Sequence, residues 1–171
     1  MPDLSREAVL RAVMPILAEA YAGPADPSST NFLNNEPDCG VFGTLDRLSA
    51  AEASMPPAPG RPTVAAHAEH LRFSLDVSTR WLRGDHTKAD WSASWAVHAV
   101  DEAEWLHLRE RLRDEYAQFL ELIDARPEID EELLAGIVGT VAHAAYHLGA
   151  LRQAALAASA SSTPFAGAAH A

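Results

Sequence analysis

The spacing of hydrophobic residues along the chain predicts an all-α fold. In four long segments, apolar side chains recur every three or four positions, the period of one face of an α-helix. The clearest stripe runs from Trp105 to Ile123 and follows Asp101 and Glu104, a capping-box pair that typically starts a helix. The sequence lacks runs with the period-two alternation of a half-buried strand. We therefore expect a four-helix bundle with short extra helices.

Proline, glycine and asparagine mark the ends of the other predicted helices. A first stripe at residues 10–21 precedes a loop at residues 24–39, and a short helix is expected after that loop. A further long helix is expected at about residues 63–83, behind a proline-rich break. The last long helix is capped by Asp130, and its predicted core face comprises Leu134, Ile137, Val138, Val141, Ala145 and Leu148.

Length, charge and cysteine content narrow the class of protein. The 171 residues fit one domain, which we place at residues 1–158, with a low-complexity segment at 159–171 expected to be disordered. The net charge of -11 repels phosphate groups, which disfavours binding to nucleic acids or anionic membranes. Cys39 is the single cysteine, so no internal disulfide can form. Because no apolar run approaches the roughly 20 residues of a membrane span, we expect a soluble, cytoplasmic protein.

The candidate chemistry lies in the histidines. His143 and His147 are four residues apart on the last helix, so both imidazoles can reach one metal ion. The helix at residues 63–83 carries His67 and His70, and both can face the bundle centre, where bundle proteins place their metal sites. Imidazole suits Zn, Ni, Cu or Fe better than Mg or Ca. The residue after His143 is alanine, which excludes the H-E-x-x-H pattern of zinc proteases.

Two stretches of sequence resemble a known family. The segment HAAYHLGALRQ at residues 143–153 looks like the C-terminal motif of the DinB/YfiT-like proteins, and residues 43–71 look like their upstream marker. The resemblance implies a four-helix bundle that binds one divalent ion, Zn or Ni, through three histidines. His143 and His147 match the pair. The third ligand is expected about seven residues after Thr63, which points to His70, with His67 as its competitor.

The resemblance also carries functional expectations. It implies a metal-dependent transferase or hydrolase that acts on a small molecule, uses a small cellular thiol and forms a homodimer. A site with three histidine ligands leaves a coordination position open, as catalytic zinc sites do. The sequence identifies no catalytic base. The alternative hypothesis is therefore a non-catalytic, dimeric helical stress or binding protein with a structural or vestigial metal site.

Overall fold

The computed structural model describes residues 5–162, and every regular element in that range is a helix. The long helices are α1 (Arg6–Ala22), α4 (Val64–Leu82), α5 (Glu102–Asp124) and α6 (Glu131–Ser162). The short ones are α2 (Val41–Asp46), α3 (Ala50–Ala53) and the 3-10 helix η1 (Ala93–Trp95). The predicted all-α bundle with short extra helices is confirmed.

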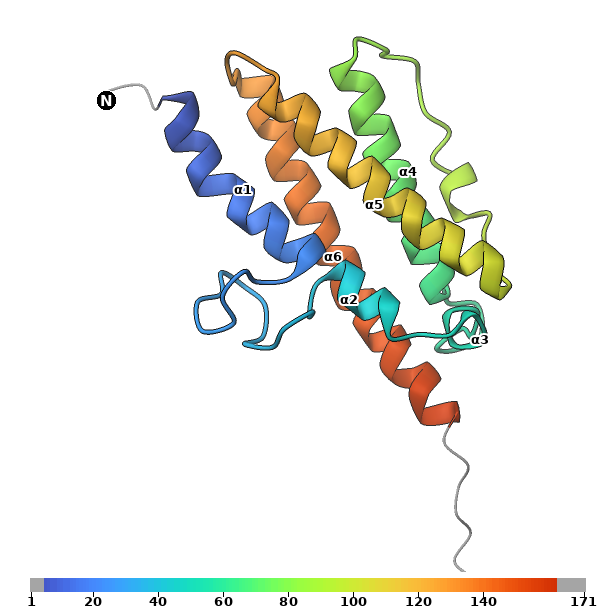
Figure 1. Ribbon diagram of the computed structural model, residues 1–171. Coiled ribbons are helices and arrows are strands. Elements are labelled where there is room, and N and C mark those ends of the chain that lie inside the picture. The colour runs from blue at the N-terminus through green and yellow to red at the C-terminus, as the bar shows by residue number, and fades with distance from the viewer. Residues whose placement is uncertain (1–4, 163–171) are drawn as a thin grey trace, which may run out of the picture.

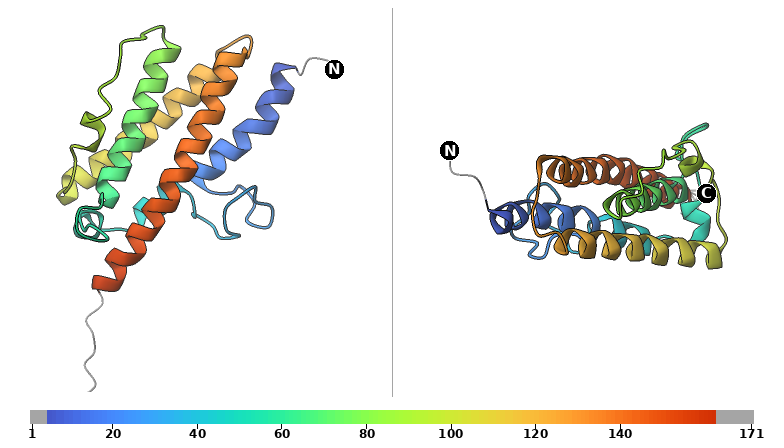
Figure 2. Two further views of the ribbon diagram at one scale, coloured as in Figure 1. Left: turned by 180° about the vertical axis from the view of Figure 1, so that it is seen from behind. Right: turned by 90° about the horizontal axis from the view of Figure 1, so that it is seen from above.

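The four long helices form a bundle in which most of the other elements contact α6. Figure 1 shows α5 crossing in front of α4 and α6, and the reverse view in Figure 2 brings α4 and α6 to the front, side by side. Helix α6 contacts α1, α2, α3 and α4, whereas α5 packs mainly against α4. The connection from α4 to α5 carries η1, which packs against α4. This arrangement places α4, α6 and η1 around one region of the molecule.

Side-chain caps fix where the helices begin. Ser49 and Glu52 form a complete capping box at α3, as Asp101 and Glu104 do at α5. The box at α5 follows the predicted sequence signature. The Thr63 hydroxyl accepts a hydrogen bond from the backbone N–H of Ala66 at 3.1 Å, so α4 starts at a defined residue. This start sets the register of the histidines in its first two turns.

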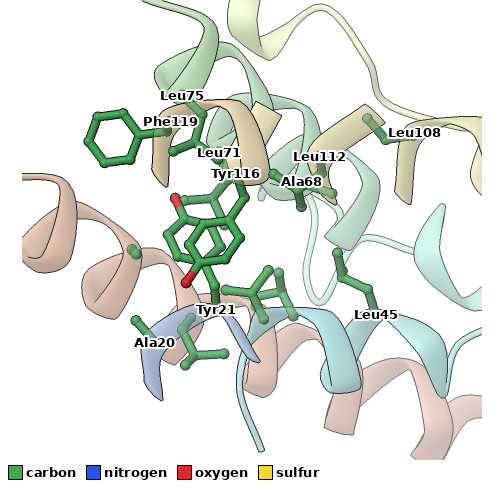
Figure 3. Close-up of a cluster of buried hydrophobic side chains, with 14 of the residues drawn as sticks. Ala20, Tyr21, Leu45, Ala68, Leu71, Leu75, Leu108, Leu112, Tyr116 and Phe119 are labelled. Carbon is green, nitrogen blue, oxygen red and sulfur yellow. The ribbon is translucent and has the colours of Figure 1, made fainter. Parts of the chain in front are cut away.

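The hydrophobic core lies where α1 and α2 meet α4, α5 and α6. Figure 3 shows the rings of Tyr21 and Tyr116 in the middle of this cluster, with Leu45, Leu71 and Leu112 among the side chains around them. The centroids of those two rings are 4.7 Å apart. The core is closed at one end by Trp105, whose indole N–H donates to the backbone carbonyl of Leu48 at 2.8 Å. A tryptophan can be buried this deeply because its only polar atom has a partner.

The inward face of α6 differs from the prediction at Val138. Its side chain is 49% exposed, whereas Ile137, Leu148 and Leu151 are buried. Apolar residues surround most of α6, so their spacing alone does not define which side faces the core. Helix α6 also continues to Ser162, past the predicted domain end at 158, and residues 163–171 lie outside the described part of the chain.

By length and composition alone, one described helix is apolar enough to cross a membrane. It is the segment Glu131–Ala160 of α6, with a mean hydropathy of 1.3. The sequence-based expectation overlooked this segment, because its many alanines raise the mean hydropathy without forming a run of large apolar side chains. Core helices of soluble proteins also meet the criterion, and α6 supplies Leu148 and Leu151 to the core. The cytoplasmic location stays a prediction.

Candidate metal centre

Four histidines from two helices meet beside η1. His67 and His70 lie in the first two turns of α4, and His143 and His147 lie one turn apart near the middle of α6. Three of them, His70, His143 and His147, each offer one ring nitrogen, and these nitrogens all lie within 4.8 Å of one another. The structure therefore brings together the three histidines that the sequence predicts as ligands. The fourth, His67, lies against His147.

The separation of two of these nitrogens fits a shared metal ion. The Nε2 atoms of His70 and His143 are 3.0 Å apart. Two nitrogens bound to one tetrahedral zinc ion at its usual bond length are about 3.3 Å apart. A small outward movement of either ring therefore gives the spacing that an ion requires. Without an ion, a proton between the two nitrogens makes the same contact a hydrogen bond.

Ser94 sets the tautomer of His70. The Ser94 hydroxyl donates its single hydrogen to the backbone carbonyl of Trp91 at 2.7 Å. Its oxygen is also 2.7 Å from Nδ1 of His70, and it has no second hydrogen to donate there. Nδ1 must therefore carry the hydrogen and donate it to Ser94. This leaves the lone pair of Nε2 on the side of His143, where a ligand atom is needed.

His67 makes an equivalent contact with His147. Their Nδ1 atoms are 3.1 Å apart, so one of the two carries the hydrogen that joins them. If His147 carries it, the Nε2 atom of His147 keeps a free lone pair for a metal ion. Metal-ligating histidines commonly donate their second ring N–H to a neighbour in this way. In that tautomer His67 accepts the hydrogen bond from His147 and lies outside the group of three.

Burial keeps the histidines neutral near pH 7. The pKa of His70 is lowered to about 4, chiefly by burial and then by repulsion from His143 and His67. Burial, with repulsion from the neighbouring histidines, lowers the pKa of His147 to about 3. The pKa of His143 and that of His67 are lowered by burial as well. Neutral imidazole is the form that binds metal, so protons compete weakly at this site.

Aromatic side chains wall the cluster and leave one side open. The Trp95 ring stacks on His70, with ring centroids 4.1 Å apart and an interplanar angle of 19°. An open hollow of about 630 Å³, which Trp95 also lines, reaches His67 and His147. Its lining residues are Pro57, Arg61, Pro62, His67, Trp95, Tyr146, His147, Ala150 and Ala154. A small molecule entering this hollow comes directly against the histidines.

Sequence reasoning missed parts of the site. Ser94 gave no signal of its own, because a serine between two tryptophans has no spacing that marks a histidine partner. Gly136 and Gly139, which precede His143 on α6, meet no heavy atom of another segment within 4 Å of the point where a Cβ atom would lie. Both glycines are exposed, and so they leave open space on that side of α6.

Comparison with known proteins bears on the ancestry of this site. A sequence model described as the DinB superfamily matches residues 41–158, which include all four histidines. A search of curated proteins and a search of solved structures gave no match.

Proposed function

Because the chain belongs to the DinB superfamily, we propose that it is a metal-dependent enzyme, a thiol transferase or hydrolase, with an open three-histidine site. His70, His143 and His147 are the proposed ligands, and Zn or Ni is the proposed ion. The observation that carries the proposal is the convergence of these three histidines, with ring nitrogens within 4.8 Å of one another. The donor set fits, because neutral imidazoles from two facing helices suit these ions.

An open site is what distinguishes a catalytic from a structural ion. Structural zinc sites are closed by four protein ligands, whereas catalytic ones keep a position for water or substrate. Here the group comprises three histidines, and one of them, His147, lines an open hollow of about 630 Å³. When bound, the ion would lower the pKa of a water or thiol and so supply a nucleophile near neutral pH.

The chain's own residues would orient and shelter that nucleophile. Ser94 fixes the ring of His70 through Nδ1, and Trp95 covers its face. His67 is the nearest side chain that can accept a proton without being a proposed ligand, since its Nδ1 lies 3.1 Å from that of His147. The residues that line the hollow include neither aspartate nor glutamate. A reaction that needs a strong protein base is therefore disfavoured.

The test is turnover by protein loaded with Zn or Ni. The purified chain is incubated with a small thiol and an electrophilic acceptor, and separately with ester and amide substrates. We expect product formation that stops on treatment with a chelator and returns with the ion. A His143→Ala variant should be inactive under every metal condition. Equal turnover before and after complete metal removal would exclude this function.

The absence of a carboxylate from the lining of the hollow favours one alternative, a non-catalytic protein with a structural or vestigial site. In that case metal removal should lower the melting temperature, and thiol, ester and amide substrates should all remain unconverted. Metal-dependent conversion of any one substrate would decide against this alternative.

A further inference from the structure

We propose that the hollow beside the histidines binds substrates that carry an anionic group such as a carboxylate, and that Arg61 holds that group. The proposal rests on the proposed metal-dependent function, since it names the substrate class of the same site. It is carried by the placement of Arg61, the charges around it and the character of the other walls.

Arg61 stands on a rigid turn at the rim of the hollow. Its backbone N–H donates to the carbonyl of Ala58 at 3.0 Å, which closes a four-residue turn. Gly60, the third residue, has a φ of 74°, and Pro59 precedes it, the arrangement of a type II turn. Pro62 follows directly and removes further backbone freedom. The turn therefore holds the arginine backbone in place before any ligand arrives.

The guanidinium of Arg61 is available to a ligand. It makes no hydrogen bond and no ion pair with a side chain or carbonyl in residues 5–162. Arg72, by contrast, is held by Glu69, and Arg113 by Asp46. An arginine without an internal partner keeps its five N–H donors for a carboxylate, which it can bind through two parallel hydrogen bonds.

Charge makes the hollow selective for anions. Among the described residues that line the hollow, Arg61 is the only formally charged one, although the whole chain carries a net charge of -11. A divalent ion on the histidines would add positive charge at the inner end. Both ends of the hollow would then attract an anion, while the surrounding acidic surface would not.

The other residues that line the hollow indicate the shape and polarity of the rest of the ligand. Trp95, Tyr146 and Pro57 supply aromatic or apolar surface, and Ala150 and Ala154 leave room beside α6. Arg61 and Trp95 also line an adjoining hollow of about 260 Å³, so the guanidinium has space on two sides. The ligand class that fits is a small molecule with a group that reaches the histidines, an apolar middle and an anionic end.

Matched pairs of thiols test the anionic end. The full-length protein loaded with Co²⁺ is titrated with ω-mercaptoalkanoates and with ω-mercaptoalkanols of equal chain length, followed by the thiolate-to-cobalt absorption band. We expect the alkanoate to bind about fivefold tighter at one or more chain lengths, the size of a good exposed charge contact. Arg61→Gln should remove this advantage. Arg11→Gln, an exposed arginine on α1 outside the hollow, should retain it.

A second titration does not depend on the metal. Binding of 4-phenylbutyrate and of 4-phenylbutanol to the metal-free protein is followed by the NMR signal of the Arg61 side-chain Nε–H. We expect the acid alone to shift this signal. Equal affinities for acids and alcohols in both titrations, or a preference that survives Arg61→Gln, would overturn the proposal. Failure of the protein to take up any metal would instead remove the proposed function, and the second titration would still decide the role of Arg61.

Discussion

Ser94 offers the sharpest test of how the candidate site is organised. Its hydroxyl is completely buried and joins the Trp91 carbonyl to Nδ1 of His70, with both contacts at 2.7 Å. Ser94→Ala keeps the packing but takes the acceptor away from the Nδ1–H of His70 in a buried contact. An unpartnered buried N–H costs about 1–3 kcal/mol, less whatever the loop recovers by relaxing. Removing the group that orients a metal-ligating histidine typically weakens metal binding about 10–100-fold, or about 1.4–2.7 kcal/mol.

The assay is competition for Zn²⁺ against a chromogenic chelator at constant pH. Ser78→Ala is the matched control, because that hydroxyl also lies on a helix beside the bundle but bonds only the carbonyl of Ser74 in its own helix. We expect Ser94→Ala to bind the ion at least tenfold more weakly and Ser78→Ala to match the unmodified chain. If Ser94→Ala folds normally and binds zinc within twofold of the unmodified chain, the hydroxyl does not orient His70 and the tautomer argument is wrong.

Three further predictions concern other residues. Burial alone would raise the pKa of Glu19, but the backbone N–H groups of residues 31–33 donate to its carboxylate and bring the pKa below its usual value. Glu19→Gln should therefore lower the free energy of unfolding, measured in urea, by about 3 kcal/mol above pH 4.5. This difference should shrink as the pH falls through the pKa of Glu19 in the folded protein. Equal stabilities of the two proteins at pH 7 would refute the prediction. His70→Ala should abolish zinc binding in the competition assay, whereas His67→Ala should only weaken it, and the reverse order would make His67 the ligand. Tyr146 and Leu156 on α6 are 75% and 66% exposed, which fits the predicted homodimer. Sedimentation velocity should therefore give about twice the chain mass of 18.4 kDa. The mass of a single chain would contradict the predicted homodimer.

Helix positions could be predicted because local chemistry determines them. The capping pairs at Ser49 and Asp101 depend only on residues three apart, so the sequence shows them directly. The orientation of α6 could not be predicted in the same way. Its apolar residues extend around the helix, so their spacing is compatible with more than one buried face. The packing of α1 and α4 against α6 selects the face that buries Leu133 and leaves Val138 exposed. Those two helices lie far from α6 in the sequence, so no local sequence pattern indicates which face of α6 is buried.

The site residues that belong to a sequence motif could be predicted, whereas those that only the fold brings to the site could not. The spacing of His143 and His147 and the distance of His70 from Thr63 identify residues that the structure brings together. Ser94 and Arg61 act from a 3-10 helix and a turn, and their neighbours in the sequence say nothing about the histidines they approach. Only the packing of η1 against α4 and the course of the proline-rich segment bring them to the site.

The most direct test of the three-histidine site is a metal count. The purified chain, expressed in medium supplemented with Zn²⁺ and Ni²⁺, is dialysed and analysed by mass spectrometry for metals, alongside His143→Ala and the matched surface variant His107→Ala on α5. We expect close to one Zn or Ni per chain for the unmodified protein and for His107→Ala, and a loss of most of that metal in His143→Ala. A full metal complement in His143→Ala, or none in the unmodified chain, would contradict the proposed centre.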